Sequence, residues 1–139
     1  MRVLSVTAQK PCSTGSGVYL TEVVRSLAKM GVSQAVVAGV TREDRVDMPE
    51  GVTVYPVYFS SEKLPYPVVG MSDEMPYTST RYRDMTEEMA GQFTAAFLEV
   101  LDEAIEKENP DIILCHHLYY LTALIRAHYP AKKVYGFCH

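Results

Sequence analysis

The chain has 139 residues, of which 47% are hydrophobic and 22% charged, a composition typical of a globular domain with one core. A net charge of -4 without a Lys/Arg cluster argues against a surface that binds DNA or RNA. The N-terminus lacks the roughly 7 to 15 apolar residues of a signal peptide, and no segment approaches the roughly 18 that span a bilayer. We therefore expect a cytoplasmic protein, with peripheral membrane contact left open.

The first part of the chain predicts three strands and one helix. β-branched residues over residues 2–8 have the length of a strand, and apolar residues at helical spacing predict a helix over residues 16–30 that a glycine ends. Residues 34–40 and 52–59 predict two more strands, separated by a polar loop. Because Pro56 cannot donate a backbone hydrogen bond, the third strand belongs near a sheet edge.

The longest predicted helix spans residues 84–108, and a helix over residues 117–129 joins two further strands at residues 111–115 and 132–139. Strands that are buried on both faces and separated by crossover helices predict the α/β class. We expect a doubly wound, Rossmann-like parallel sheet of at least five strands, in the order 3-2-1-4-5, within three αβα layers. Ligands of such sheets bind beyond the carboxyl ends of the strands, here at the switch point between strands 1 and 4.

The sequence Gly15-Ser16-Gly17 lies at that switch point, between the first strand and the first helix. Backbone N–H groups and the positive helix end there suit an anion or a sugar hydroxyl. The alternative is a tight turn in which Ser16 caps the helix, and position alone does not separate the two. Leu20 replaces the third glycine of a dinucleotide motif, and Val18 stands where a P-loop needs lysine, so NAD and ATP hydrolysis are disfavoured.

Cysteines and histidines also gather near the carboxyl ends of three strands: Cys12, Cys115, His116, His117, Cys138 and His139. Such a set could bind zinc or copper, but alternate strand residues point to opposite faces, so we expect no metal site. Without a CxxC pair, the thiols are expected to be reduced, with Cys115 and Cys138 as small core residues. Three imidazoles at one cleft predict that at least one contacts a ligand.

Three stretches resemble the group 1 glycosyltransferases, retaining enzymes of the two-domain GT-B fold. GSGVYLTEVVRSLAKMG resembles their glycine loop and first helix, NPDIILCHH their fourth-strand stretch, and VYGFCH a strand that ends in a His facing the donor sugar. The likeness covers residues 2–40 and 109–139. Leu114 stands where many members have a first His, and Val32-Ser33 where His-Glu is common; neither position is expected to do chemistry.

The resemblance implies that residues 1–139 are the N-terminal, acceptor-side domain of an enzyme whose nucleotide-sugar domain is absent from this chain. Such an enzyme transfers a hexosyl group from a nucleotide-diphosphate sugar to a carbohydrate, metabolite or lipid-linked acceptor, without a metal or an organic cofactor. The chain alone is expected to be inactive. The site residues that the resemblance implies are Gly15, Ser16 and Gly17 at the donor diphosphate, His116 and His117 on the acceptor side, and His139 as the catalytic residue at the donor sugar.

Residues 59–85 contain three prolines and are too irregular for a strand pair. They are also too long for a loop that only connects two elements, so we expect them to have a function. We interpret them as a wall of the acceptor site whose rings, hydroxyls and cation could hold a sugar or an anionic group: Tyr77, Thr78, Ser79, Arg81 and Tyr82. The alternative is a surface excursion that caps the longest helix.

A second function class remains open, a non-catalytic flavodoxin-like module that binds a small ligand or a partner. A receiver-type module needs acidic residues after the first and third strands, and the sequence has none there. The length of the native reading frame would separate the two classes, because a glycosyltransferase needs about one more domain.

Overall fold

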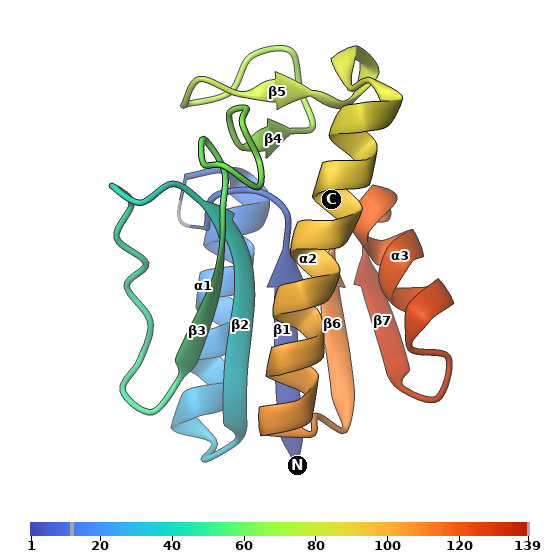
Figure 1. Ribbon diagram of the computed structural model, residues 1–139. Helices are drawn as coiled ribbons and strands as arrows, with labels where there is room; N and C mark the ends of the chain where they lie inside the picture. Colours follow the sequence, from blue (N-terminus) through green and yellow to red (C-terminus); the bar gives the residue numbers. More distant parts are fainter. Residues whose placement is uncertain (12, 139) are drawn as a thin grey trace.

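The computed structural model describes residues 1–11 and 13–138 and has three αβα layers around one parallel sheet (Figure 1). The sheet has the order β3-β2-β1-β6-β7, which confirms the predicted order 3-2-1-4-5 and the Rossmann-like α/β class. β3 lies at an edge, as its proline predicted. The strands are β1 (Arg2–Thr7), β2 (Ser33–Val40), β3 (Thr53–Tyr58), β6 (Ile112–His116) and β7 (Lys133–Phe137).

One face of the sheet is covered by α2 (Glu87–Glu108) and α3 (Tyr120–His128), as Figure 1 shows. Phe93, Phe97 and Leu101 of α2 are fully buried in the larger of two apolar clusters. The ring centroids of Phe93 and Phe97 lie 4.4 Å apart, and that of Phe59 lies 6.0 Å from Phe97. Burying one such side chain contributes about 1.5–3 kcal/mol, so this face carries the main core.

The ends of α2 follow from its capping residues. At the start, Thr86 Oγ1 accepts a hydrogen bond from the Met89 N–H at 3.2 Å. At the end, Asn109 takes the left-handed conformation with φ of 43°, directly before Pro110. Among the described residues, none of the helices has both the length and the apolar character needed to cross a bilayer.

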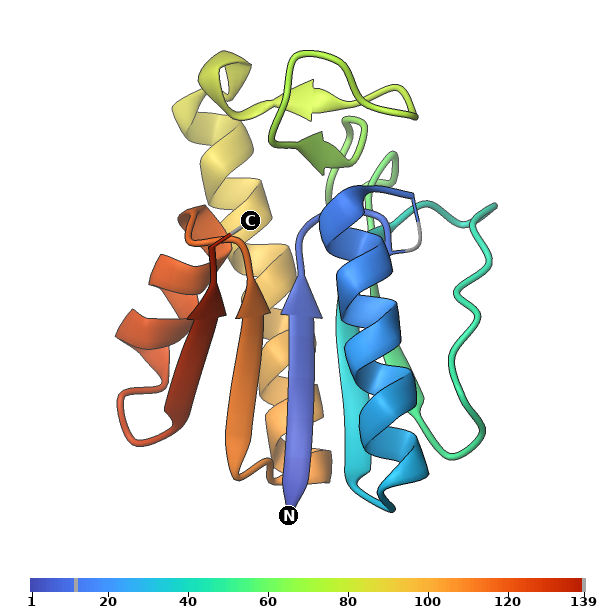
Figure 2. The ribbon, with the colours of Figure 1, turned by 180° about the vertical axis from the view of Figure 1, so that it is seen from behind.

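The other face carries α1 (Gly15–Lys29), which packs over β1 and β2 through Leu20 and Val24 (Figure 2). Thr14, not Ser16, caps this helix, because Thr14 Oγ1 accepts a hydrogen bond from the Gly17 N–H at 3.0 Å. The alternative in which Ser16 is the cap is therefore wrong.

No helix of the described chain covers β6 and β7 on the α1 side of the sheet (Figure 2). The expectation that every strand is buried on both faces is wrong for β7, because this edge strand has a helix on one side only. Tyr135 on β7 is 55% exposed, and Tyr19 reaches across from α1, with its ring centroid 5.4 Å from that of Phe137.

The segment between β3 and α2 folds over the carboxyl edge of the sheet. It contains β4 (Val69–Gly70), β5 (Thr80–Arg81) and the short helix η1 (Tyr82–Asp84). β4 and β5 form a parallel pair, so the expectation that this segment is too irregular for a strand pair is wrong. Two-residue strands leave no alternating pattern to detect. Side chains brace the pair, because Thr80 Oγ1 donates to the Pro67 carbonyl at 2.7 Å and the Tyr77 hydroxyl to the Val69 carbonyl at 2.9 Å.

Candidate functional site

A cleft of about 400 Å³ lies at the carboxyl ends of β1 and β6, which are neighbours in the sheet at its switch point. One wall is the start of α1 and the other is the segment over the sheet edge, and Gln9 and His117 also line the cleft. In a doubly wound sheet this is the position where ligands bind. The cleft lining includes Gln9, Ser13, Thr14, Gly15, Ser16, Met71, Met75 and His117.

The glycine loop contributes the first turn of α1 to this cleft. Gly15 and Ser16 line it, whereas the Gly17 N–H is used by the Thr14 cap. Ser16 is 6% exposed, and its hydroxyl lies 3.1 Å from Thr14 Oγ1. The positive end of a 15-residue helix therefore adjoins the cleft and favours an anionic group there.

Gly15 meets no packing requirement from the residues that the structure describes. A Cβ built on Gly15 would find nothing within 4 Å, and its φ is not positive. Gly39 is different, because a Cβ there would lie 2.2 Å from the Ala8 carbonyl oxygen. Folding alone explains the glycine at position 39, whereas close approach of a ligand would explain the one at position 15.

His117 lies directly after β6 with φ of 79°, in the left-handed region that residues with side chains seldom occupy. Its N–H donates to the Phe137 carbonyl at 3.1 Å, and its own carbonyl accepts from Thr122 Oγ1 at 2.6 Å. The end of β7 and the start of α3 thus hold a conformation that costs about 1–2 kcal/mol. Strained backbone held at a cleft in this way is common at functional sites.

His116, the last residue of β6, is only 5% exposed. Its ring stacks on Phe137 at a centroid distance of 4.9 Å and an interplanar angle of 22°, and it lies 6.1 Å from the ring of Tyr19. His117 lines the cleft, and His116 lines, together with His117, a narrow hollow next to it.

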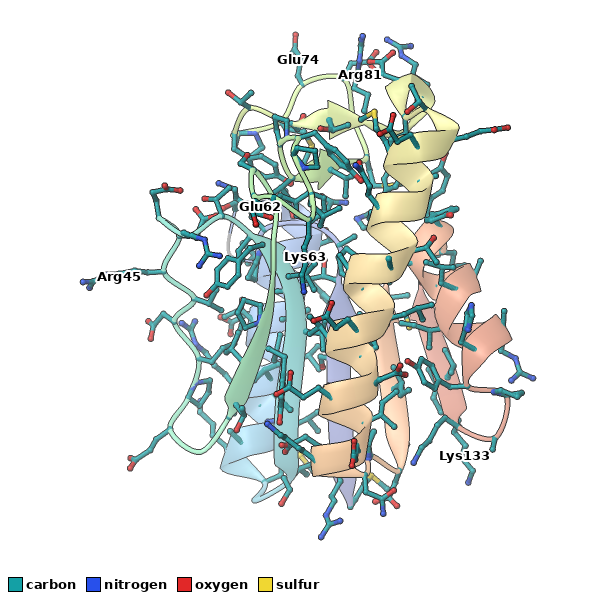
Figure 3. The ribbon with its side chains drawn as sticks, in the orientation of Figure 1. Arg45, Glu62, Lys63, Glu74, Arg81 and Lys133 are labelled. Atoms are coloured by element: carbon teal, nitrogen blue, oxygen red, sulfur yellow. The ribbon has the colours of Figure 1, made fainter. Side chains whose placement is uncertain are left out.

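The loop residues predicted for the acceptor wall are not brought together. Tyr82 lines a narrow hollow next to the cleft, but Thr78 is exposed, and neither Thr78 nor Ser79 lines the cleft. Arg81 points away from the sheet at the far end of the loop (Figure 3) and is paired with Asp84 at 2.7 Å. The guanidinium of Arg81, which we expected to bind an anionic acceptor group, is therefore paired with the carboxylate of Asp84.

Tyr77 has a bracing role beside the cleft. Lys10 Nζ lies 5.0 Å from the centroid of the Tyr77 ring and 3.0 Å from Asp44, so it connects two loops. Burial raises the pKa of Tyr77 to about 12, which keeps its hydroxyl protonated as a donor. Although burial acts to raise the pKa of Asp44, hydrogen bonds from Thr41 and Lys10 lower it overall.

The cysteines differ in environment. Cys115 is 2% exposed in the main core, as predicted, and burial raises the pKa of its thiol to about 11. Cys138 is exposed, so the expectation that it is a core residue is wrong, because it follows the edge strand β7. Within residues 1–11 and 13–138 no three His, Cys, Asp or Glu side chains are grouped to hold a metal ion. Cys12 and His139, the predicted catalytic residue, lie outside the described residues.

Sequence reasoning missed most of the residues that line the cleft: Gln9, Ser13, Thr14, Met71, Ser72, Glu74, Met75 and Pro76. Gln9 is 3% exposed and lines the cleft, and the signal for it was a polar residue directly after a buried strand at the switch point. Met71 and Met75 also line the cleft, but the loop that carries them has no periodic pattern.

Together the sheet order and the cleft define a Rossmann-like α/β domain with a candidate ligand site at its switch point. No family model matches the chain, and no curated protein matches it in sequence. Among solved structures the chain is similar to UDP-galactose 4-epimerase, with a TM-score of 0.39 and 10% identity over 84% of this chain. It spans 37% of that structure's chain.

Proposed function

We propose that this chain is the acceptor-side domain of a retaining GT-B glycosyltransferase, which transfers a hexosyl group from a nucleotide-diphosphate sugar to an acceptor hydroxyl. The observation that supports this proposal is the cleft at the switch point. Gly15, whose Cβ position is open, and His117, whose backbone is strained, both line this cleft. Two of the stretches that resemble the group 1 family contribute residues to this cleft, Gly15 and Ser16 from the glycine loop and His117 from the fourth-strand stretch.

The glycine loop would bind the donor diphosphate. During transfer the bond between the sugar C1 and the diphosphate oxygen breaks, a bond from C1 to the acceptor oxygen forms, and the acceptor proton goes to the departing phosphate. Negative charge therefore grows on the diphosphate, and the amides of Gly15 and Ser16 with the positive end of α1 would stabilise it. One such donor group contributes a factor of roughly 10²–10³ in kcat.

The histidines would have separate roles. His117 lines the cleft and would contact the reacting end of the acceptor, while His116 lines the narrow hollow next to the cleft and stacks on Phe137. His139 keeps the role that the family resemblance implies, a contact with the donor sugar. The nucleotide would be held by a second domain, so this chain alone would be inactive, and no metal or organic cofactor is part of the proposal.

A turnover assay tests this proposal. The full-length protein would be incubated with a panel of nucleotide-diphosphate sugars and a mixture of hydroxyl acceptors, with release of the nucleoside diphosphate as the readout. We expect release that depends on an acceptor, a product carrying one hexose, and an anomeric configuration that matches the donor. Acceptor-independent hydrolysis only, or no release with any donor, would contradict the proposal.

A further inference from the structure

A second hollow lies next to the cleft at the glycine loop, and a narrow hollow of about 10 Å³ between them, here called the neck, shares lining residues with both. The neck shares Gln9 and His117 with the cleft and Tyr82 and Tyr119 with the second hollow, and His116 lines it as well. The second hollow has about 470 Å³, within the range of a small-molecule site. This hollow, here called the tyrosine groove, is lined chiefly by Tyr82, Met85, Ala90, Leu118, Tyr119 and Tyr120.

The rings of the tyrosine groove are held in place. Tyr82 and Tyr119 meet edge to face with their centroids 4.5 Å apart. The Tyr120 ring lies 5.3 Å from that of Phe93, and its hydroxyl is 3.0 Å from Thr94 Oγ1. Rings that are already ordered lose little conformational entropy when a ligand binds, so the groove is suited to stack an apolar or aromatic body.

The charges around the tyrosine groove restrict its occupant. Among the residues that the structure describes, no charged side chain lines the groove, and the adjacent start of α2 carries Glu87 and Glu88. The nearby cations Arg81 and Arg83 are paired with acids, the former with Asp84 at 2.7 Å and the latter with an aspartate at 3.2 Å. An anionic headgroup or bilayer surface would meet these carboxylates, so an uncharged occupant is favoured.

We propose that the tyrosine groove binds the apolar ring of a small, uncharged alcohol whose hydroxyl passes the neck toward His117. That this alcohol is the glycosyl acceptor rests on the proposed function. The groove supplies ring faces and a methionine, and the neck supplies polar groups on the side of the cleft. A lipid-linked acceptor carries a phosphate beside its apolar part. In the tyrosine groove that phosphate would lie close to the carboxylates of Glu87 and Glu88, so such an acceptor does not fit.

Methionine methyl NMR tests the binding directly, because methionines lie in the tyrosine groove, in the cleft and far from both, and each methyl signal responds to a ligand bound near it. Met85 lines the tyrosine groove, Met71 and Met75 line the cleft, and Met30 is 74% exposed at the far end of α1. The chain labelled at its methionine methyl groups would be titrated with 2-phenylethanol. We expect a saturable shift of the Met85 signal and none at Met30.

Variants locate the site within the groove. Tyr119→Ala removes one ring face and should weaken 2-phenylethanol binding about tenfold, the scale of one aromatic contact. Ala90→Leu fills the groove from α2 and should abolish the Met85 shift. Tyr135→Ala is the matched control, because it removes a 55% exposed tyrosine outside the groove and should leave binding unchanged. Thermal melting verifies that each variant is folded, and Tyr119→Ala alone suffices if Ala90→Leu does not fold.

The opposite results would overturn the inference. Phenylacetate that binds as tightly as 2-phenylethanol, or a larger Met85 shift with dioleoylphosphatidylglycerol vesicles than with 2-phenylethanol, would show that the occupant is anionic or a membrane. Unchanged binding of 2-phenylethanol in Tyr119→Ala, or no saturable Met85 shift up to the solubility of 2-phenylethanol, would show that the groove does not bind the alcohol. The two proposals fail separately. A protein without hexosyl transfer can still show the Met85 shift, and an active enzyme without that shift overturns only the assignment of the tyrosine groove.

Discussion

The core beneath α2 and the carboxyl edge of the same sheet are built by different rules. Under α2, Phe93, Phe97 and Leu101 are all 0% exposed and contact other apolar groups. At the edge, His117 holds a strained backbone and Gly15 has open space where a side chain could stand. Packing explains Phe93, Phe97 and Leu101, whereas it does not explain the strained backbone of His117, and strain of this kind is common at functional sites.

The largest expected effect is on the core side of this comparison. Phe97→Ala removes a fully buried ring that packs on Phe59 and Phe93, and should lower the free energy of unfolding by about 3–5 kcal/mol. Chemical denaturation of the variant and of Tyr135→Ala, an exposed tyrosine, would measure it. A similar loss of unfolding free energy in Phe97→Ala and Tyr135→Ala would show that the core beneath α2 is not the main source of stability.

At the edge, His117→Asn should separate stability from activity. Asparagine tolerates the left-handed conformation better than most residues, so the free energy of unfolding should stay within about 0.5 kcal/mol of the original. The imidazole is lost from the cleft, so kcat/KM of the full-length enzyme should fall by about ten- to a hundredfold. A large loss of stability with unchanged kcat/KM would identify a structural histidine instead.

The smallest effect concerns a polar residue inside the sheet. Ser5 on β1 is 1% exposed, and its hydroxyl has no hydrogen-bond partner within the part of the chain that the structure describes. Replacing it by alanine removes a buried, unsatisfied group, so Ser5→Ala should raise the free energy of unfolding by up to about 1 kcal/mol. A decrease of that size in thermal or chemical denaturation would show that Ser5 belongs with the edge residues.

The sheet could be predicted from the sequence because each strand is a short apolar run and the topology follows general rules. Residues 34–40 and 111–115 have no pattern beyond apolar character, yet their separation by helices was sufficient to order the strands. The Thr14 cap was missed because serine has a higher N-cap propensity than threonine, so propensity favours Ser16, and only the hydrogen bond to the Gly17 N–H identifies Thr14 as the cap.

The candidate site was predicted only in part. The glycine loop and His117 follow strand ends, which the sequence identifies. The pairing of Tyr82 with Tyr119 joins residues far apart in the chain and leaves no spacing to detect. Arg81 was assigned to the acceptor wall because a cation is visible in sequence, whereas its ion pair with Asp84 is visible only in the fold.

The central claim is that the start of α1 binds the donor diphosphate, and a pair of glycine variants tests it most directly. Gly15 and Gly91 both lie in helices, and a Cβ at either one has nothing within 4 Å. In the full-length enzyme we expect Gly15→Val to lower kcat/KM for the nucleotide sugar at least tenfold, because the side chain blocks the diphosphate, while Gly91→Val leaves it unchanged. Equal kcat/KM in two folded variants would contradict the claim.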